Sequence, residues 1–378
     1  MSRINFISKK KFNFRLPSKF FFENEKKLKY KLFENVKLND LFWKNYLQKK
    51  EKRKKLLLIS GLSRSGNHLL LSILDQHSQI SLCGGEDGML RNLLSMIKKF
   101  GEEKIIYKIK NSDYRFFSKL SGSRIKKNKI FLFDKWKKVA YLKNITKLRH
   151  SGTQGLNFTT ILDFKNIKIK VFYKKYINYL KKKKKFNNFF DFFYHYLDAQ
   201  RVLFGEKNKN QKYHYTYFHS GLRREINFLL ERKIDAKIIV PVRDFKTFYF
   251  SYLKGIYRTE KVTSKTLNDI WENWFHKVVD FLKLKKKFPK NVIIVFYEDI
   301  VDRPKVITNR ILKKLGLKKM IKIKTSILGK PSLGNSSFSI KNLKPGQIYK
   351  NKNKMILKNR DLPREYRYVM KKLIKEKI

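Results

Sequence analysis

The feature that most constrains this chain is an apolar run that ends in a glycine-rich loop and continues into a helical pattern. Residues 56–60 read LLLIS, the loop GLSRSG follows at 61–66, and 68–77 reads HLLLSILDQH. A short apolar run bounded by glycine predicts a buried strand, and the spacing of the later leucines predicts a helix. This order of strand, loop and helix predicts an α/β unit whose loop directs backbone N–H groups at the helix start.

Further apolar runs along the chain repeat this alternation. The strands that they predict lie at 80–83, 129–134, 236–243 and 291–299. Helical patterns lie between them at 88–100, 267–288 and 303–315. Runs that are apolar on both faces suit the central strands of a parallel sheet that helices cover on each side. The sequence therefore predicts an α/β fold with a central parallel sheet flanked by helices.

Changes in charge and in the apolar pattern divide the chain into segments. Residues 1–54 form a basic N-terminal extension, 55–345 form the main domain, and 346–378 form a basic tail that we expect to be helical. Within the main domain, about 151–230 breaks the alternation with an aromatic and basic segment. We expect that segment to be a mostly helical insertion.

Charge and cysteine content narrow the classes of function. The 91 Lys and Arg against 30 Asp and Glu give a formal net charge of +61. Lys, Asn, Ile, Phe and Tyr abound together and share A/T-rich codons, so genome composition explains much of the lysine. The positive field still attracts nucleotides, acidic glycans and anionic membranes. A single cysteine, Cys83, excludes an intrachain disulfide and a cysteine-rich metal site.

Targeting signals are weak in this sequence. The basic N-terminus has no apolar core of the kind found in a signal peptide. No stretch approaches the ~18 apolar residues of a membrane-spanning helix. We therefore expect a cytoplasmic protein without a transmembrane segment.

The glycine loop has chemistry of its own. Gly61 and Gly66 have the G-x-x-x-x-G spacing of a nucleotide phosphate loop. Such a loop usually continues with a lysine for the phosphates and a hydroxyl for Mg²⁺, whereas this chain has Asn67 and His68 there. The missing hydroxyl disfavours ATP or GTP hydrolysis. Arg64 supplies a forked cation that suits a tetrahedral oxyanion group.

Several segments resemble one known family. SGLSRSGNHLLLSILDQHSQI resembles the 5′-phosphosulfate loop of sulfotransferases that use 3′-phosphoadenosine 5′-phosphosulfate (PAPS). IIVPVRDFKTFYFSYLKGIYR resembles the family's 3′-phosphate segment, in which an arginine leaving a strand and a serine in the next helix hold that phosphate. Arg243 and Ser251 have the expected separation of eight. The stretch 291–317 resembles a later strand and helix, and 334–338, GNSSF, resembles a loop of bacterial members that closes over the nucleotide.

This resemblance covers about 54–340 and implies a sulfotransferase fold, which is like that of the P-loop-containing nucleotide hydrolases, with PAPS as co-substrate and no metal. The cofactor-binding residues that it implies are Arg64, Ser65, Gly66, Asn67, His68, Arg243, Ser251, Tyr297, Gly334, Asn335 and Ser336. The histidines are scattered along the chain and form no obvious ligand cluster.

The same resemblance suggests catalytic residues. The stretch Cys-Gly-Gly-Glu-Asp resembles the place where the tyrosylprotein branch and related glycan branches have a catalytic glutamate, so Glu86 is the favoured base. The chain has one residue more than that pattern, which leaves Asp87 as a rival to Glu86. His68, near the start of the predicted helix, is a second rival. Lys135, after a predicted strand, resembles a family lysine that would stabilise the bridging oxygen. Arg64 would share the charge on the sulfuryl group.

The acceptor stays open between a glycan, a lipid head group, a small alcohol and a peptide tyrosine. The aromatic and basic segment at 171–218 is the expected acceptor-side element, and its lysines suit peripheral contact with an anionic membrane. One alternative is a basic nucleic-acid-binding protein on a degenerate phosphate-loop fold. The spacing of Arg243 and Ser251 disfavours it, and we expect no specific nucleic acid. The other alternative, a small-molecule kinase, is disfavoured by the missing lysine and hydroxyl.

Overall fold

The structure is a computed structural model of the 378-residue chain. The residues that it describes are 55–82, 89–111, 124–126, 129–131, 188, 191–194, 197, 213–218, 223–253, 263–327, 330–331, 346–348 and 357–378. The extension predicted over 1–54 lies outside them. The predicted basic tail contains helix α15 (Tyr366–Glu376).

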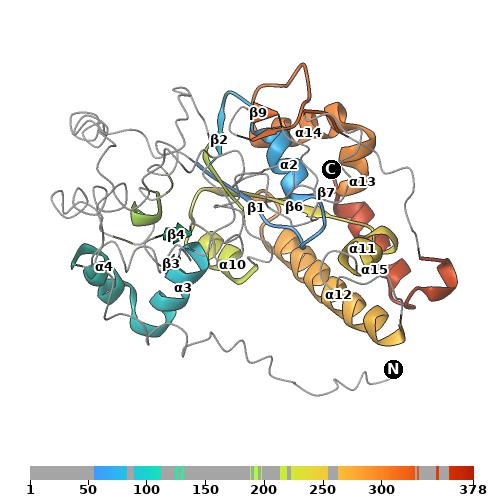
Figure 1. Cartoon of the computed structure of the whole chain (residues 1–378), viewed down its shortest axis with the longest axis horizontal. Helices are drawn as coiled ribbons and strands as arrows, with labels where there is room; N and C mark the ends of the chain where they lie inside the picture. Colours follow the sequence, from blue (N-terminus) through green and yellow to red (C-terminus); the bar gives the residue numbers. More distant parts are fainter. Residues whose placement is uncertain are drawn as a thin grey trace.

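A five-stranded sheet forms the centre of the molecule (Figure 1). Its strands are β1 (Lys55–Ile59), β2 (Ile80–Leu82), β5 (Tyr213–Phe218), β6 (Ala236–Val242) and β7 (Val292–Phe296). The strand order is β2-β5-β1-β6-β7, and every neighbouring pair is parallel. The predicted α/β fold with a central parallel sheet is therefore confirmed.

Helices cover both faces of this sheet, as Figure 1 shows for α2 and α14 above it and for α10 and α12 below it. On one face lie α2 (Asn67–Leu74), α13 (Tyr297–Asp302) and α14 (Pro304–Leu315). The other face packs against α3 (Met89–Phe100), α4 (Glu102–Asn111), α10 (Arg223–Glu231), α11 (Phe245–Tyr252), α12 (Ser264–Lys287) and α15.

Strand β1 shows why the central runs are continuously apolar. Leu56 and Leu58 belong to one buried core, and Leu57 and Ile59 belong to the core on the opposite face. Successive side chains of a strand point to opposite faces, and here both faces are dry. Each residue of the run is therefore buried, and burial of each aliphatic side chain stabilises the fold by about 1.5–3 kcal/mol.

Two strand predictions need correction. Residues 129–131 form strand β4 (Lys129–Phe131), but it pairs antiparallel with β3 (Arg124–Lys126) in a separate two-stranded sheet. Its expected place in the parallel sheet is therefore wrong for the described residues. Conversely, β5 lies within the segment predicted to be mostly helical, and it pairs with both β1 and β2. Its sequence YHYTYF has the aromatic and β-branched content of a strand, a signal that the surrounding lysine-rich helical pattern obscured.

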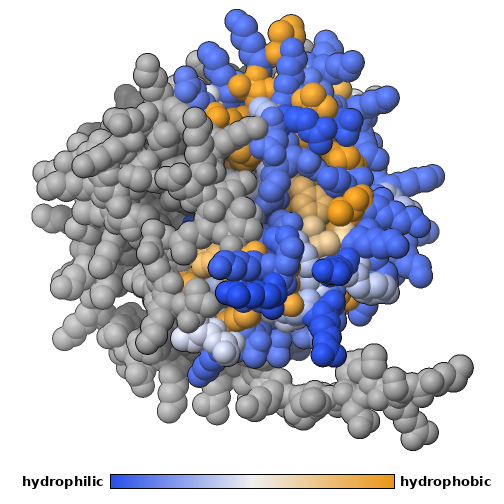
Figure 2. Space-filling view, turned by 90° about the vertical axis from the view of Figure 1, so that its right-hand side faces the viewer, coloured by the Kyte–Doolittle hydropathy of each residue, from blue (hydrophilic) through white to orange (hydrophobic). Residues whose placement is uncertain are grey.

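The end of the chain lies against β7. The Ile378 N–H donates to the carbonyl of Ile294 at 3.2 Å, and Lys377 Nζ lies 2.8 Å from Asp299 Oδ2. The tail is thus attached to the sheet as well as to the helices. Among the coloured, described residues in Figure 2, most are hydrophilic and the apolar ones form small patches. Within the described ranges, no helix has the length and apolar character needed to cross a membrane.

Candidate anion-binding site

The loop between β1 and α2 is held tightly against the rest of the fold. Arg64 has φ +75° and Gly66 has φ +89°, so the backbone turns twice through the left-handed region. A Cβ on Gly66 would lie 2.5 Å from Cδ2 of Tyr297, and a Cβ on Gly61 would overlap the carbonyl oxygen of Pro241. The two glycines are therefore required by the close approach of β6 and α13.

Asn67 braces this loop from within. Its Oδ1 accepts from the Gly61 N–H at 2.8 Å, and its Nδ2 donates to the Leu62 carbonyl at 2.8 Å. An ordinary phosphate loop has a lysine here, directed at the phosphates. In this chain the side chain of Asn67 maintains the loop's shape, and its backbone N–H belongs to the helix N-terminus that attracts anions.

Ser65 lies inside the same loop, and its side chain is fully buried. Among the described residues it has no hydrogen-bond partner for its Oγ. A buried hydroxyl without a partner costs about 1–3 kcal/mol, so such groups commonly mark a place where a ligand or water binds. His68 follows as the second residue of α2 and is partly exposed.

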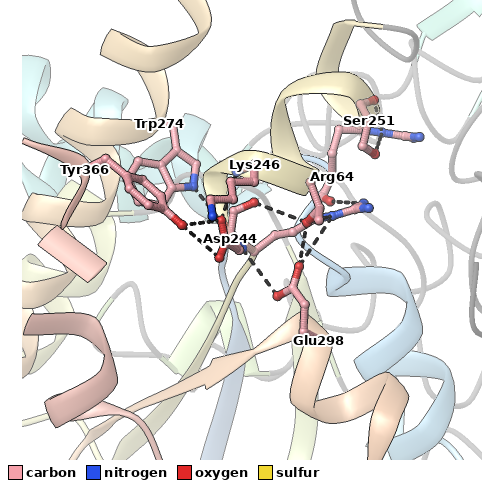
Figure 3. Close-up of polar contacts among 9 residues, drawn as sticks. Arg64, Asp244, Lys246, Ser251, Trp274, Glu298 and Tyr366 are labelled. Atoms are coloured by element: carbon pink, nitrogen blue, oxygen red, sulfur yellow. Dashed lines mark hydrogen bonds and ion pairs between the residues drawn. The ribbon is translucent and has the colours of Figure 1, made fainter. Parts of the chain in front are cut away.

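Arg64 joins this loop to α11. Its Nε donates to the carbonyl of Ser251 at 3.0 Å and to Ser251 Oγ at 3.2 Å. The two residues are 187 positions apart in the chain, and Figure 3 shows Arg64 directed at Ser251. The cation of the phosphate loop and the serine predicted to hold the 3′-phosphate therefore occupy one site.

Arg243 lies beside this pair, at the point where β6 ends. It is 7% exposed, its Nε donates to Thr247 Oγ1 at 3.0 Å, and its Nη1 donates to the Arg64 carbonyl at 3.4 Å. The guanidinium carbon lies 4.5 Å from the centre of the Tyr297 ring, a cation–π contact. Tyr297 is itself 3% exposed, so it packs between Gly66 and Arg243.

Glu298 and Thr247 complete the surroundings of Arg243. Thr247 Oγ1 donates to Glu298 Oε1 at 2.6 Å, and the Asp244 N–H donates to Glu298 Oε2 at 3.3 Å. Arg243 Nε lies 3.9 Å from Glu298 Oε1. Burial raises the pKa of Glu298 despite these contacts. The sequence alone assigned no site role to Glu298 or Thr247. The available signal for Thr247 was its place four residues after Arg243.

Arg64 and Arg243 give the site its positive charge. Burial, followed by the charge of Arg243, lowers the pKa of Arg64 to about 10. Burial also lowers the pKa of Arg243. Both guanidiniums still remain charged at neutral pH. Desolvated like charges side by side are unfavourable, and a bound anion would relieve both the repulsion and the lost solvation.

The structure thus brings together Arg64, Ser65, Gly66, Asn67, His68, Arg243, Ser251 and Tyr297 at the ends of β1, β6 and β7. The remaining predicted site residues lie outside the described residues: Glu86, Asp87, Lys135, Gly334, Asn335 and Ser336. Among the parts of the chain that the structure describes, no group of three or more His, Cys, Asp or Glu side chains is arranged to hold a metal ion.

The sequence matches a family model described as the sulfotransferase family over residues 57–320. That span is more than half of the chain and runs from β1 to just beyond α14. The chain belongs to the sulfotransferase family. The matched region contains the loop of Arg64 together with Arg243 and Ser251, whereas α15 lies after its end.

Three of the solved structures that match this chain are described as sulfotransferases or sulfotransferase domains. The sulfotransferase domain of the curacin biosynthetic pathway is 14% identical, with a TM-score of 0.47, 86% of this chain covered and 99% of that one. The domain from the Synechococcus PCC 7002 olefin synthase is 15% identical, with a TM-score of 0.40 and coverages of 72% and 76%. The sulfotransferase from Alicyclobacillus acidocaldarius is 14% identical, with a TM-score of 0.35 and coverages of 73% and 86%.

Membership of the family therefore rests on the sequence match over residues 57–320. A search of curated proteins gave no significant match.

Proposed function

We propose that this sulfotransferase takes its sulfuryl group from PAPS and transfers it to a hydroxyl or amine. The observation that carries the proposal is the contact of Arg64 with Ser251, with Arg243 beside both. In this arrangement Arg64 and the loop amides bind the 5′-phosphosulfate. Arg243 and Ser251 bind the 3′-phosphate, which distinguishes PAPS from other adenine nucleotides.

The donor set of the site fits such an anion. It offers two charged guanidiniums, the buried Ser65 hydroxyl and the N-terminus of α2. Each is a hydrogen-bond donor, and charge-assisted bonds from guanidinium forks suit the tetrahedral oxygens of sulfate and phosphate. Glu298, the nearby acid, already accepts hydrogen bonds from Thr247 and the Asp244 N–H.

The proposed reaction gives one task each to a base, to Lys135 and to Arg64. PAPS, when bound, supplies a sulfuryl group whose sulfur bonds to the acceptor as its bond to the 5′-phosphate breaks. Glu86 is proposed to take the acceptor's proton, with Asp87 and His68 as the rival bases. Lys135 is proposed to stabilise the bridging oxygen as negative charge develops on it. Arg64 neutralises charge on the sulfuryl group in both ground and transition states.

The acceptor is proposed as a glycan, a lipid head group or a small molecule, held by the aromatic and basic segment at 171–218. The +61 charge supports an anionic acceptor or peripheral contact with an anionic membrane, in a cytoplasmic protein. A kinase is the less favoured function, because the Asn67 side chain occupies the place of the phosphate-binding lysine and braces the loop instead. A protein that binds nucleic acid nonspecifically would not need Arg243 and Ser251 at this spacing.

The test compares two nucleotides that differ only in the 3′-phosphate. Adenosine 3′,5′-bisphosphate and AMP are titrated calorimetrically into the full chain in the presence of EDTA. We expect the bisphosphate to bind more tightly, and we expect Arg243→Ala to remove about 2–4 kcal/mol of that difference because a charged pair is broken in a buried site. Arg310→Ala, an exposed arginine on α14, is the matched control and should change neither affinity. Equal affinity of wild type for both nucleotides would contradict the proposal, and an absolute requirement for Mg²⁺ would favour the kinase.

A further inference from the structure

Helix α15 reaches the anion-binding site from outside the region that defines the family. The Tyr366 hydroxyl, at the start of α15, donates to the Asp244 carboxylate, with 2.9 Å to Oδ1 and 3.0 Å to Oδ2. Resting on the proposed function, we propose that Tyr366 is a positioning residue for the 3′-phosphate, acting through Asp244 on Arg243. The C-terminal tail is then part of the cofactor site, although it touches no reacting atom.

Asp244 is the link, because three elements meet at it. Its Oδ1 accepts from the Lys246 N–H at 2.9 Å, so it caps the N-terminus of α11. Its own N–H donates to Glu298 at 3.3 Å. Asp244 follows Arg243 directly, and the helix that it caps carries both Thr247 and Ser251. A shift of Asp244 therefore moves the start of α11, and with it Ser251 relative to Arg243.

The backbone of Arg243 is fixed from the same side. Trp274 Nε1, fully buried on α12, donates to the Arg243 carbonyl at 2.9 Å. Figure 3 shows the Trp274 and Tyr366 side chains together on one side of Asp244, with Arg64 and Ser251 on the other. Bidentate recognition of phosphate tolerates only about 0.5 Å of displacement, so this support matters for affinity.

Buried contacts and a backbone hydrogen bond hold the C-terminal segment beside Asp244. Val369 and Leu373 of α15 are buried in the core that α12 also lines, and the Leu357 N–H donates to the Lys246 carbonyl at 3.3 Å. Burial and the adjacent Asp244 charge raise the pKa of Tyr366, so its hydroxyl remains a donor at neutral pH.

The experiment measures the affinities of the full chain for adenosine 3′,5′-bisphosphate and for AMP after Tyr366→Phe, which removes only the hydroxyl. We expect about a tenfold loss of affinity for the bisphosphate, because Arg243 and Ser251 are then placed less precisely for the 3′-phosphate, and less than a twofold change for AMP. Tyr368→Phe, two positions along α15 and 62% exposed, is the matched control and should change neither affinity.

A second variant tests the route through Asp244. In an Asp244→Asn background, Tyr366→Phe should lower the affinity for the bisphosphate less than twofold, because the charged acceptor of the hydroxyl is already absent. Equal losses for both nucleotides after Tyr366→Phe would identify a purely structural role and overturn the inference, and so would unchanged affinities. If wild type binds both nucleotides equally, the proposed function itself fails, and the positioning role falls with it.

Discussion

Gly66→Ala should damage this protein far more than its single added methyl group suggests. Gly66 has φ +89°, and its Cβ would lie 2.5 Å from Cδ2 of Tyr297. Contacts of that kind below about 3.0 Å are essentially never observed, so the ring must move. The Tyr297 ring is buried and packs on the Arg243 guanidinium at 4.5 Å. The methyl group therefore displaces a core side chain and the site's second cation together.

The expected loss in the free energy of unfolding has two parts, one from the backbone and one from packing. A variant at a second glycine, Gly101, separates them. An alanine in left-handed backbone costs about 1–2 kcal/mol, offset by about 0.4–1 kcal/mol because alanine restricts the unfolded chain. Overpacking a dense core adds about 1–3 kcal/mol. Gly101 has φ +82° with nothing within 4 Å of its Cβ position, so Gly101→Ala shows the backbone part alone. We expect about 1 kcal/mol for Gly101→Ala and about 2–4 kcal/mol for Gly66→Ala.

Urea unfolding followed by circular dichroism measures both losses. Thermal unfolding should agree, with a midpoint about 4–8 °C lower for Gly66→Ala at roughly 2 °C per kcal/mol in a chain of this size. In a Tyr297→Ala background the ring is absent, so Gly66→Ala should then cost no more than Gly101→Ala. Equal losses for the two glycine variants in the wild-type background would refute the reasoning, because the contact with Tyr297 would contribute nothing.

The remaining predictions concern pH and turnover. Since the fold raises the pKa of Glu298 above its usual 4.5, the folded state binds its proton more tightly than the unfolded state does. The free energy of unfolding should therefore fall as pH rises from 4.5 through the raised pKa. Glu298→Gln should flatten that decline in urea titrations between pH 4.5 and 7.5. Parallel pH profiles for wild type and variant would contradict this prediction. With an acceptor in hand, Glu86→Gln should lower kcat by about 10²–10⁴-fold at unchanged bisphosphate affinity. Lys135→Ala should lower kcat in the same assay, whereas Arg64→Ala should weaken binding as well; an unchanged kcat would remove either residue from the mechanism.

Much of the fold was predictable because its central strands carry their own signal. β1, β6 and β7 are short strands that contain the apolar runs LLLI, IIVPV and VIIVF, and burial on both faces explains such runs. The glycine loop after β1 was equally clear, since its spacing is local and the strained backbone at Gly66 requires glycine. The separation of Arg243 and Ser251 was visible for the same reason, as both lie within one strand end and the following helix.

The sequence by itself therefore determined the α/β class, the glycine loop and the two halves of the proposed anion site, because each depends on residues close together in the chain. Only the tertiary structure decided how they combine: β5 enters the sheet between β2 and β1, and β4 pairs elsewhere. It also decided that Arg64 contacts Ser251 and that Tyr366 reaches Asp244 from 122 residues away. Such contacts leave no periodicity in the chain, because they arise from the packing of whole elements on a shared sheet.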